Sequence, residues 1–225
     1  GIPLNYRNND GWGVHTYTWV NDAGDNFYVR YWWKSQDPQR MEGFKTDEEA
    51  ERNQFSFATK DLYDFIKGGG RPSYDFKVQI INASDTEYIQ ALGGLDTILD
   101  TTTEWNPSFP LESDVKFPPF QDVGVLEFNE NVRSQFLQNE MIAFAPSRMV
   151  PGIEPSDEKM LQGRLFAYRD TQRYRLGVNN QQLPVNRPIS GSQFRSFSMG
   201  SMNTNEPSQQ NDVNYFPSRV MRNYI

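Results

Sequence analysis

Arginines, tyrosines and a glutamine recur at helical intervals between residues 157 and 177, and this segment has the clearest potential for chemistry. Four side chains fall at positions i, i+4, i+8 and i+11 and so share one face of a helix: Arg164, Tyr168, Gln172 and Arg175. A fixed positive charge one turn from a buried tyrosine favours the phenolate, a hard oxygen donor suited to ferric iron. Gly163, on the same helix, would let a flat group or another backbone approach closely because it has no Cβ.

Taken alone, an Arg-x-x-x-Tyr pair is more often part of an amphipathic helix whose Arg and Tyr face solvent. The same holds for the one histidine of the chain, His15, because a lone histidine on a strand is usually a core residue with its hydrogen bonds satisfied. Both interpretations stay open at the level of single residues.

Composition excludes several classes of protein. The 225 residues contain no Cys and one His, which removes disulfide frameworks, thiol nucleophiles and His-cluster metal sites. The chain carries 22 Lys+Arg against 29 Asp+Glu, a net charge of −7, with no basic run to grip phosphate backbones. No stretch approaches the roughly 18–20 apolar residues of a bilayer span. We therefore expect neither nucleic acid nor a membrane as a partner.

Four segments have the alternation or the aromatic and β-branched content of strands: 12–20, 27–33, 74–80 and 123–128. The first two form a hairpin, because the turn-forming residues 21–25 lie between them. About 40 irregular residues are expected between the third strand and the fourth. In one antiparallel sheet, four strands leave two edges with unpaired backbone groups, so the sheet needs more strands than the chain supplies.

Two helices are expected. The first opens with the acidic turn 46–49 (TDEE) and ends at the glycines 68–70. The second has Ser156 as its cap, Asp157 and Glu158 in its first turn, an apolar stripe after them, and Gly177 as its stop. The segment from 189 to 214 has no period and is expected to be a surface loop or lightly ordered tail.

The segment around Arg164 resembles the proximal haem helix of the haem catalases. The resemblance covers about residues 1–217 and is carried by five segments: 160–168 (MLQGRLFAY), 150–156 (VPGIEPS), 182–186 (QLPVN), 143–147 (AFAPS) and 11–17 (GWGVHTY). It implies an α+β fold in which this chain supplies about four strands of an antiparallel β-barrel, with helices and a long wrapping loop. Residues 1–130 would form the second half of the barrel with a helical insertion. Residues 131–225 would form the wrapping segment, with the proximal helix and an irregular tail.

The resemblance also implies a ferric haem whose iron is ligated by the Tyr168 phenolate. Arg164 would hold the phenolate, and a relay would continue from Arg164 through His15 to Glu158, where the family usually has Asp. Arg175 would pair with a haem propionate. The other implied haem-contacting positions are Val14, His15, Phe144, Met160, Gly163 and Gln172.

Many members of the family also bind NADPH at the surface. The matching positions are Asp10, Trp12, Lys34 and Trp105. Asp10 replaces the family's Asn and places an acceptor-only group near a phosphate-rich ligand, which disfavours this cofactor.

The family's distal His and Asn have no counterpart, because they lie in the half of the family sequence that precedes Gly1. The chain is thus expected to hold the iron ligand and no catalytic residue. The resemblance implies a catalase, an oxidoreductase of the oxidative-stress response that converts hydrogen peroxide to water and oxygen. It would work with an N-terminal companion chain or segment that supplies the distal residues, in a homotetramer.

Two alternatives stay open. One is another hydroperoxide chemistry on the same scaffold, such as a peroxidase or an allene oxide synthase-like enzyme. The other is a catalase-derived storage, structural or haem-carrying protein without enzymatic activity. The chain ends in Arg222-Asn223-Tyr224-Ile225 without the peroxisomal tripeptide, which leaves the compartment open between secreted and cytoplasmic.

Overall fold

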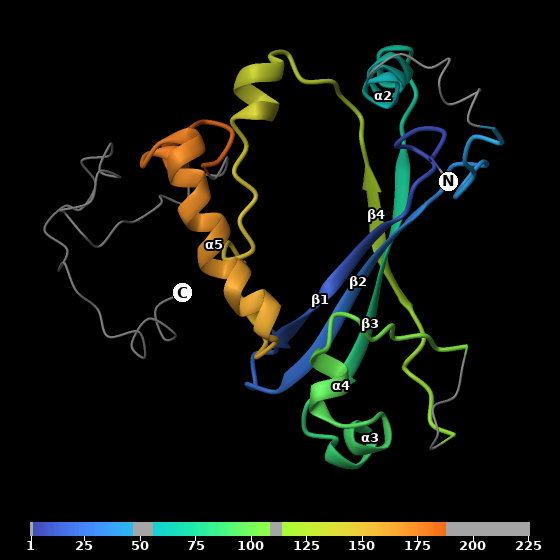
Figure 1. Cartoon of the computed structure of the whole chain (residues 1–225), viewed down its shortest axis with the longest axis vertical. Coiled ribbons are helices and arrows are strands. Elements are labelled where there is room, and N and C mark those ends of the chain that lie inside the picture. The colour runs from blue at the N-terminus through green and yellow to red at the C-terminus, as the bar shows by residue number, and fades with distance from the viewer. Residues whose placement is uncertain (1, 47–55, 109–113, 188–225) are drawn as a thin grey trace, which may run out of the picture. The chain divides into compact units, whose positions relative to one another are not determined.

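A computed structural model describes residues 2–46, 56–108 and 114–187 (Figure 1). The chain divides into two compact units. The first comprises Gly1–Asn131 and Met149–Arg164, and the second comprises Val132–Arg148 and Leu165–Ile225. Within the described residues, no helix has the length and apolar character needed to cross a bilayer.

The first unit is built on a five-stranded antiparallel sheet in the order β4-β3-β2-β1-β5. Its strands are β1 (Gly11–Val20), β2 (Asn26–Ser35), β3 (Ser73–Asn82), β4 (Gln121–Glu127) and β5 (Ile153–Pro155). The four predicted strands are confirmed. β5 was not predicted, because three residues that end in proline are too short to show an alternating pattern.

The β1–β2 hairpin is closed by side-chain chemistry in its turn. The Asn21 side-chain oxygen accepts hydrogen bonds from the backbone N–H groups of Ala23 and Asp25, at 3.0 and 2.8 Å. Gly24 adopts φ 87°, which a residue with a Cβ rarely does. The predicted turn is therefore confirmed.

An irregularity in β1 changes which residues are buried. The register moves from Gly13 opposite Tyr31 to Tyr17 opposite Val29, so a four-residue step in β1 faces a two-residue step in β2. In a regular strand, His15 and Thr16 would point to opposite faces. Here both are buried, and both lie within the irregular stretch of β1.

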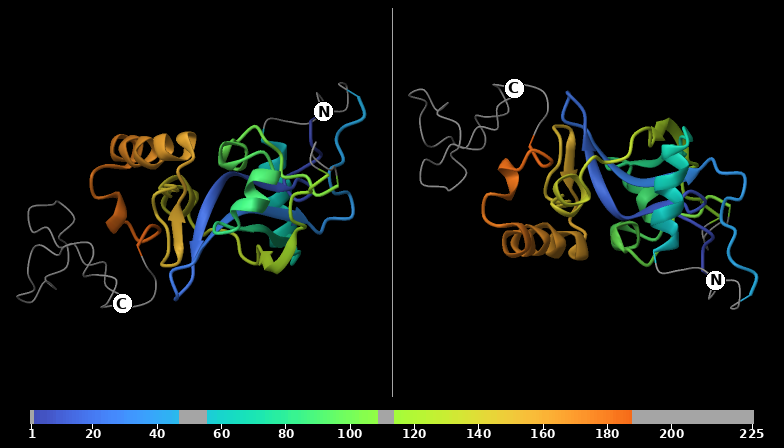
Figure 2. Two further views of the ribbon diagram at one scale, coloured as in Figure 1. Left: turned by 90° about the horizontal axis from the view of Figure 1, so that it is seen from below. Right: turned by 90° about the horizontal axis from the view of Figure 1, so that it is seen from above.

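The core of the first unit lies against one sheet face and is built largely by the segment after β3. Its members are Ile81, Ile89, Leu92, Ile98, Trp105 and Phe117. This segment was predicted to be irregular, and that prediction was wrong in part. It contains the short helices α3 (Thr86–Ala91) and α4 (Leu95–Leu99), which follow the end of β3 (Figures 1 and 2). Helices of six and five residues are too short to establish a helical period.

Helix α2 (Phe57–Lys67) follows Ser56, which has φ 63°. The acidic residues 47–49 lie outside the described residues. The end of α2 is confirmed, because the Gly70 N–H bonds to the Phe65 carbonyl at 2.9 Å and Gly69 takes φ 92°.

Helix α5 (Lys159–Leu176) is the long helix predicted from the sequence. Its stop at Gly177 is confirmed, with φ 94° and an N–H bond to Arg173 at 3.0 Å. Its start was predicted too early, because Asp157 and Glu158 precede the helix instead of filling its first turn. The Glu158 side chain accepts the Leu161 N–H at 3.0 Å, as a capping residue does.

In the second unit, the described residues are 132–148 and 165–187. They contain the one-turn π-helix η1 (Phe136–Glu140), the later part of α5 and the 3₁₀ helix η2 (Asn180–Gln182). Asn186 joins these segments, because its amide accepts the Ala143 N–H at 2.8 Å and donates to the Met141 and Asn180 carbonyls at 2.9 Å each. The segment 189–214, predicted to be irregular, lies outside the described residues.

Candidate functional site

His15 is the centre of a buried row of three polar side chains in the first unit. His15 is 6 % exposed. Its Nδ1 lies 2.7 Å from Glu158 Oε2, and its Nε2 lies 2.5 Å from Arg164 Nη1. The structure therefore brings together the three residues of the predicted relay.

The row fixes the tautomer of the imidazole. A guanidinium has only hydrogen-bond donors, so Arg164 donates to Nε2 and that nitrogen accepts. In the neutral ring the proton is then on Nδ1, which donates to Glu158 Oε2. The hydrogen bonds run in one direction, from Arg164 through His15 to Glu158.

Glu158 fits the place where the family usually has the shorter Asp. One carboxylate oxygen accepts from His15, and the other accepts the Leu161 N–H at the start of α5. The side chain is 3 % exposed, and a negative charge is favourable at a helix N-terminus. The additional methylene is thus accommodated with both oxygens bonded.

A second layer of buried polar groups supports the row and was not predicted from the sequence. The Ser156 hydroxyl donates to the Thr16 carbonyl and accepts the Glu158 N–H at 3.3 Å. The Thr16 hydroxyl in turn donates to the Ile98 carbonyl at 3.0 Å. Ser156 was predicted only as a helix cap, and nothing in a single sequence links it to Thr16, 140 positions away.

Arg30 extends this layer into the core. Its guanidinium donates to Thr16 Oγ1 and to the carbonyls of Ile98, Asp100 and Thr103, at distances between 2.5 and 3.1 Å. Burial lowers the pKa of Arg30 to about 10, partly offset by the negative charges of Glu158 and Asp100. Arg30 therefore stays protonated at neutral pH and places a positive charge behind the row.

Tyr17 follows the β1 bulge and lies within the electrostatic field of the row. Burial raises its pKa above the usual range, the Arg164 charge acts in the lowering direction, and Glu158 acts in the raising direction. Because burial dominates, Tyr17 is expected to keep its proton at neutral pH.

Tyr168 lies on α5 four residues after Arg164, and it is 38 % exposed. Three other predicted haem-contacting residues are more exposed: Val14 at 48 %, Met160 at 55 % and Phe144 at 81 %. At Gly163, an added Cβ would meet no atom within 4 Å. The apolar side chains predicted to contact haem are thus exposed at the protein surface and are not part of the core.

Gln172 and Arg175 belong to the second unit. Gln172 is 6 % exposed and donates to the Phe144 carbonyl at 2.8 Å, which makes it a link between α5 and residues 132–148. Arg175 donates to the carbonyls of Glu140 and Ile142 at 2.5 and 2.6 Å. A guanidinium has five donors, so these bonds are compatible with a further contact to a carboxylate.

The predicted NADPH positions do not fit a surface cofactor as a group. Asp10 has no exposed side-chain area, and its oxygens accept from Arg40, Trp32 and the Ser35 N–H. Trp105 is 3 % exposed and stacks on Phe117. Lys34 and Trp12 are the two remaining positions, with Trp12 53 % exposed and stacked on Trp32. Asp10 and Trp105 are thus committed to contacts within the chain.

The described residues contain no group of three or more His, Asp or Glu side chains that could hold a metal ion. A tyrosine ligand is a different kind of donor, and the family resemblance implies the Tyr168 oxygen in this role.

A model of the catalase family matches residues 1–222. A catalase of Vibrio parahaemolyticus is 40 % identical over 224 residues, which are 98 % of this chain and 40 % of the relative. A catalase of Pisum sativum is 40 % identical over 222 residues, 97 % of this chain and 41 % of the relative.

Solved structures show the same likeness. A bacterial catalase superimposes with a TM-score of 0.79 at 35 % identity, over 96 % of this chain and 39 % of that chain. Catalase A from Saccharomyces cerevisiae gives a TM-score of 0.77 at 33 % identity, over 96 % and 42 %. The chain thus spans about two fifths of the length of these proteins. The sheet is confirmed as an antiparallel half-barrel of the catalase type, and the chain belongs to the catalase family.

Proposed function

We propose that this chain is the proximal, haem-binding portion of a catalase-type protein that decomposes hydrogen peroxide to water and oxygen. The observation that carries the proposal is the buried row Arg164–His15–Glu158, which ends one helical turn before Tyr168. A guanidinium with a fixed orientation stabilises a nearby phenolate. The Tyr168 phenolate is the proposed iron ligand, because tyrosine is the residue that holds the haem iron in catalases.

The residues present fit a haem. The donor is a hard oxygen, Gly163 leaves the surface of α5 open, and the apolar side chains of Val14, Met160 and Phe144 are exposed. Arg175 would pair with a propionate, and a charge-assisted pair of this kind is among the stronger polar contacts. NADPH is not part of the proposal, because Asp10 and Trp105 are engaged within the chain.

When bound, haem supplies ferric iron that exchanges electrons with peroxide. The chain's own residues ligate and orient it. Arg164 would stabilise the phenolate charge of Tyr168, which comes one helical turn later in α5, and His15 with Glu158 holds the guanidinium in place. The only histidine of the chain is engaged in this row, so the proton transfers at the peroxide need a group from another segment.

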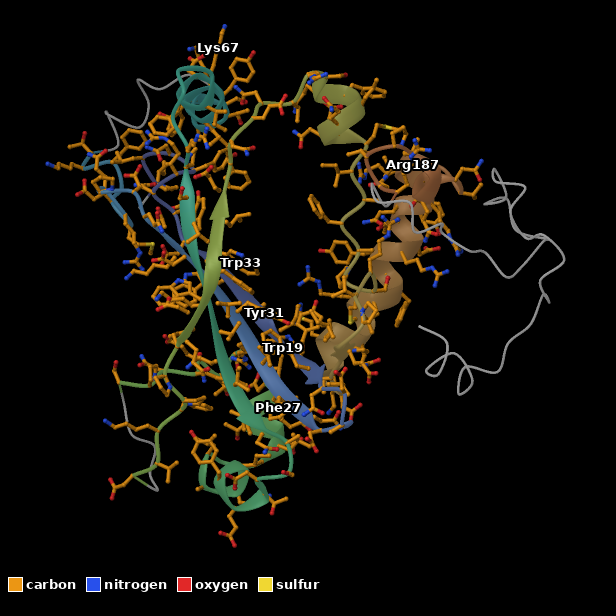
Figure 3. The ribbon with its side chains drawn as sticks, turned by 180° about the vertical axis from the view of Figure 1, so that it is seen from behind. Trp19, Phe27, Tyr31, Trp33, Lys67 and Arg187 are labelled. Carbon is orange, nitrogen blue, oxygen red and sulfur yellow. The ribbon has the colours of Figure 1, made fainter. Side chains whose placement is uncertain are left out.

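That segment is the proposed partner, either a further part of a longer polypeptide or a companion chain. Strand β4 supports this partner, because β4 is an edge strand of the sheet and all seven of its residues are exposed. Figure 3 shows Trp19, Phe27, Tyr31 and Trp33 along the sheet. A hollow of about 310 Å³ is lined there by Trp19, Phe27 and Ile80. Strand pairing and apolar contact at these places would complete the barrel. The proposed assembly is a homotetramer, as the family resemblance implies.

The test uses the protein purified with whatever segment accompanies it, identified by intact mass spectrometry. Absorption spectroscopy should show a Soret band, and hydrogen peroxide should release oxygen. Lack of a Soret band would exclude every haem function. Haem without oxygen release would exclude catalase activity and leave a peroxidase, an allene oxide synthase-like enzyme or a haem carrier. Absence of any accompanying segment would contradict the proposed partner.

A further inference from the structure

We propose that Ser156 is a positioning residue that fixes the His15 imidazole relative to the Glu158 carboxylate. The proposal depends on the proposed function only for what the row Arg164–His15–Glu158 does. The contacts within the row, and the role of Ser156 in positioning it, do not require haem.

The Ser156 hydroxyl contacts the backbone on both sides of the His15–Glu158 pair. It donates to the carbonyl of Thr16, which follows His15 in β1. It accepts the N–H of Glu158 itself, at 3.3 Å. A single oxygen atom therefore ties together the two chain segments, 140 positions apart, that present the imidazole and the carboxylate.

The bulge in β1 explains why this tie is needed. The regular β1–β2 pairing is interrupted between Gly13 and Tyr17, so the Thr16 backbone lies where the ladder is irregular. Bulged residues lose ladder hydrogen bonds, and a buried carbonyl without a partner is unfavourable. The Ser156 hydroxyl donates to this carbonyl, next to the residue whose imidazole contacts Glu158.

Ser156 is buried and hydrogen-bonded through its backbone as well. It is 3 % exposed, and its carbonyl accepts a hydrogen bond from the Gln162 side-chain amide at 2.7 Å. The preceding residue, Pro155, pairs with Tyr17 at the end of β5. Ser156 is thus fixed at the junction between β5 and α5, where a small displacement would move Glu158 relative to His15.

The test follows the proton on His15 Nδ1 by NMR in the full chain labelled uniformly with ¹⁵N. Because the sequence contains one histidine and its neutral ring carries one N–H, the imidazole region of the spectrum has one N–H signal. We expect Ser156→Ala to accelerate exchange of this proton with water at least tenfold, while the amide of Val78 in the core keeps its rate. Ser156→Thr, which keeps the hydroxyl, should stay within threefold of the original rate.

Ser73→Ala is the matched control, because the Ser73 hydroxyl donates to the Arg71 carbonyl at an exposed position. Equal acceleration at His15 and Val78 would show a general loss of stability and overturn the proposal, as would exchange in Ser156→Ala within twofold of the original. If Ser156→Ala does not fold, Ser156→Val is compared with Ser156→Thr. Similar His15 exchange in these two would also overturn the proposal. None of these measurements needs haem, so a failure here is distinguishable from a failure of the proposed function.

Discussion

Arg164 Nη1 lies 2.5 Å from Nε2 of His15, although the two residues are 149 positions apart in the sequence. The other ring nitrogen contacts Glu158 at 2.7 Å, so the imidazole spans a cation and an anion that are themselves six residues apart. This arrangement gives the Arg164 side chain a fixed partner within the protein. The orientation of the guanidinium is therefore present before any group binds near Tyr168.

Replacing Glu158 by Gln should destabilise the chain by about 2–3 kcal/mol, because it removes a buried carboxylate that accepts from both His15 and the Leu161 N–H. Glu158→Asp keeps the charge and should cost less. Urea unfolding followed by tryptophan fluorescence measures both. Asp157→Asn, at an exposed position, should change stability by less than about 0.5 kcal/mol. A Glu158→Gln variant as stable as this control would contradict the structural role of the row.

Replacing Gly163 by Ala should have opposite effects on stability and on haem binding. In the chain without haem, the new methyl group meets no atom within 4 Å and removes a glycine from inside a helix. We expect a gain of about 0.5–1 kcal/mol. Haem affinity should fall, because the methyl group fills the space proposed for the cofactor. Thermal unfolding and haem titration measure the two effects, and unchanged affinity would exclude close approach at Gly163.

Arg30→Met should destabilise the chain by about 3 kcal/mol or more. The substitution removes the Arg30 donor from the carbonyls of Asp100 and Thr103, and it leaves the Ile98 carbonyl with the Thr16 hydroxyl alone. Arg71→Ala is the control, because the Arg71–Glu127 pair is exposed and should contribute less than about 1 kcal/mol. Urea unfolding distinguishes the two, and equal effects would contradict the role assigned to Arg30.

Tyr31 should make the protein sensitive to alkali. Burial raises its pKa above the usual value, and the hydrogen bond from Trp19 offsets this in part. Between its unfolded and folded pKa values, the unfolded state binds fewer protons than the folded state, so stability falls as pH rises above about 10. Tyr31→Phe should make this decline above about pH 10 shallower in urea unfolding. An unchanged slope would show that Tyr31 is not the group responsible.

The regular elements could largely be predicted from the sequence, because their patterns are local. β1 to β4 alternate or are rich in aromatic residues, and α5 is long enough to show its period. β5, α3 and α4 could not be predicted, because each has six residues or fewer. They gain their stability from pairing and packing with distant segments.

Prediction from the sequence was limited in the same way for the side chains of the candidate site. The family resemblance supplied His15, Glu158 and Arg164, and the structure shows that the three are in contact. Ser156 and Arg30 could not be found in this way, because both act through hydrogen bonds to backbone carbonyls. A carbonyl is present at every residue and carries no sequence signal.

Ligation of haem iron by the Tyr168 oxygen is tested by resonance Raman spectroscopy of the haem-loaded protein. We predict enhanced tyrosinate modes that disappear in Tyr168→Phe. They should persist in Tyr174→Phe, since Tyr174 is 76 % exposed and bonds to Asp170. Tyrosinate modes that survive in Tyr168→Phe, or that are absent from the unaltered protein, would contradict this ligation.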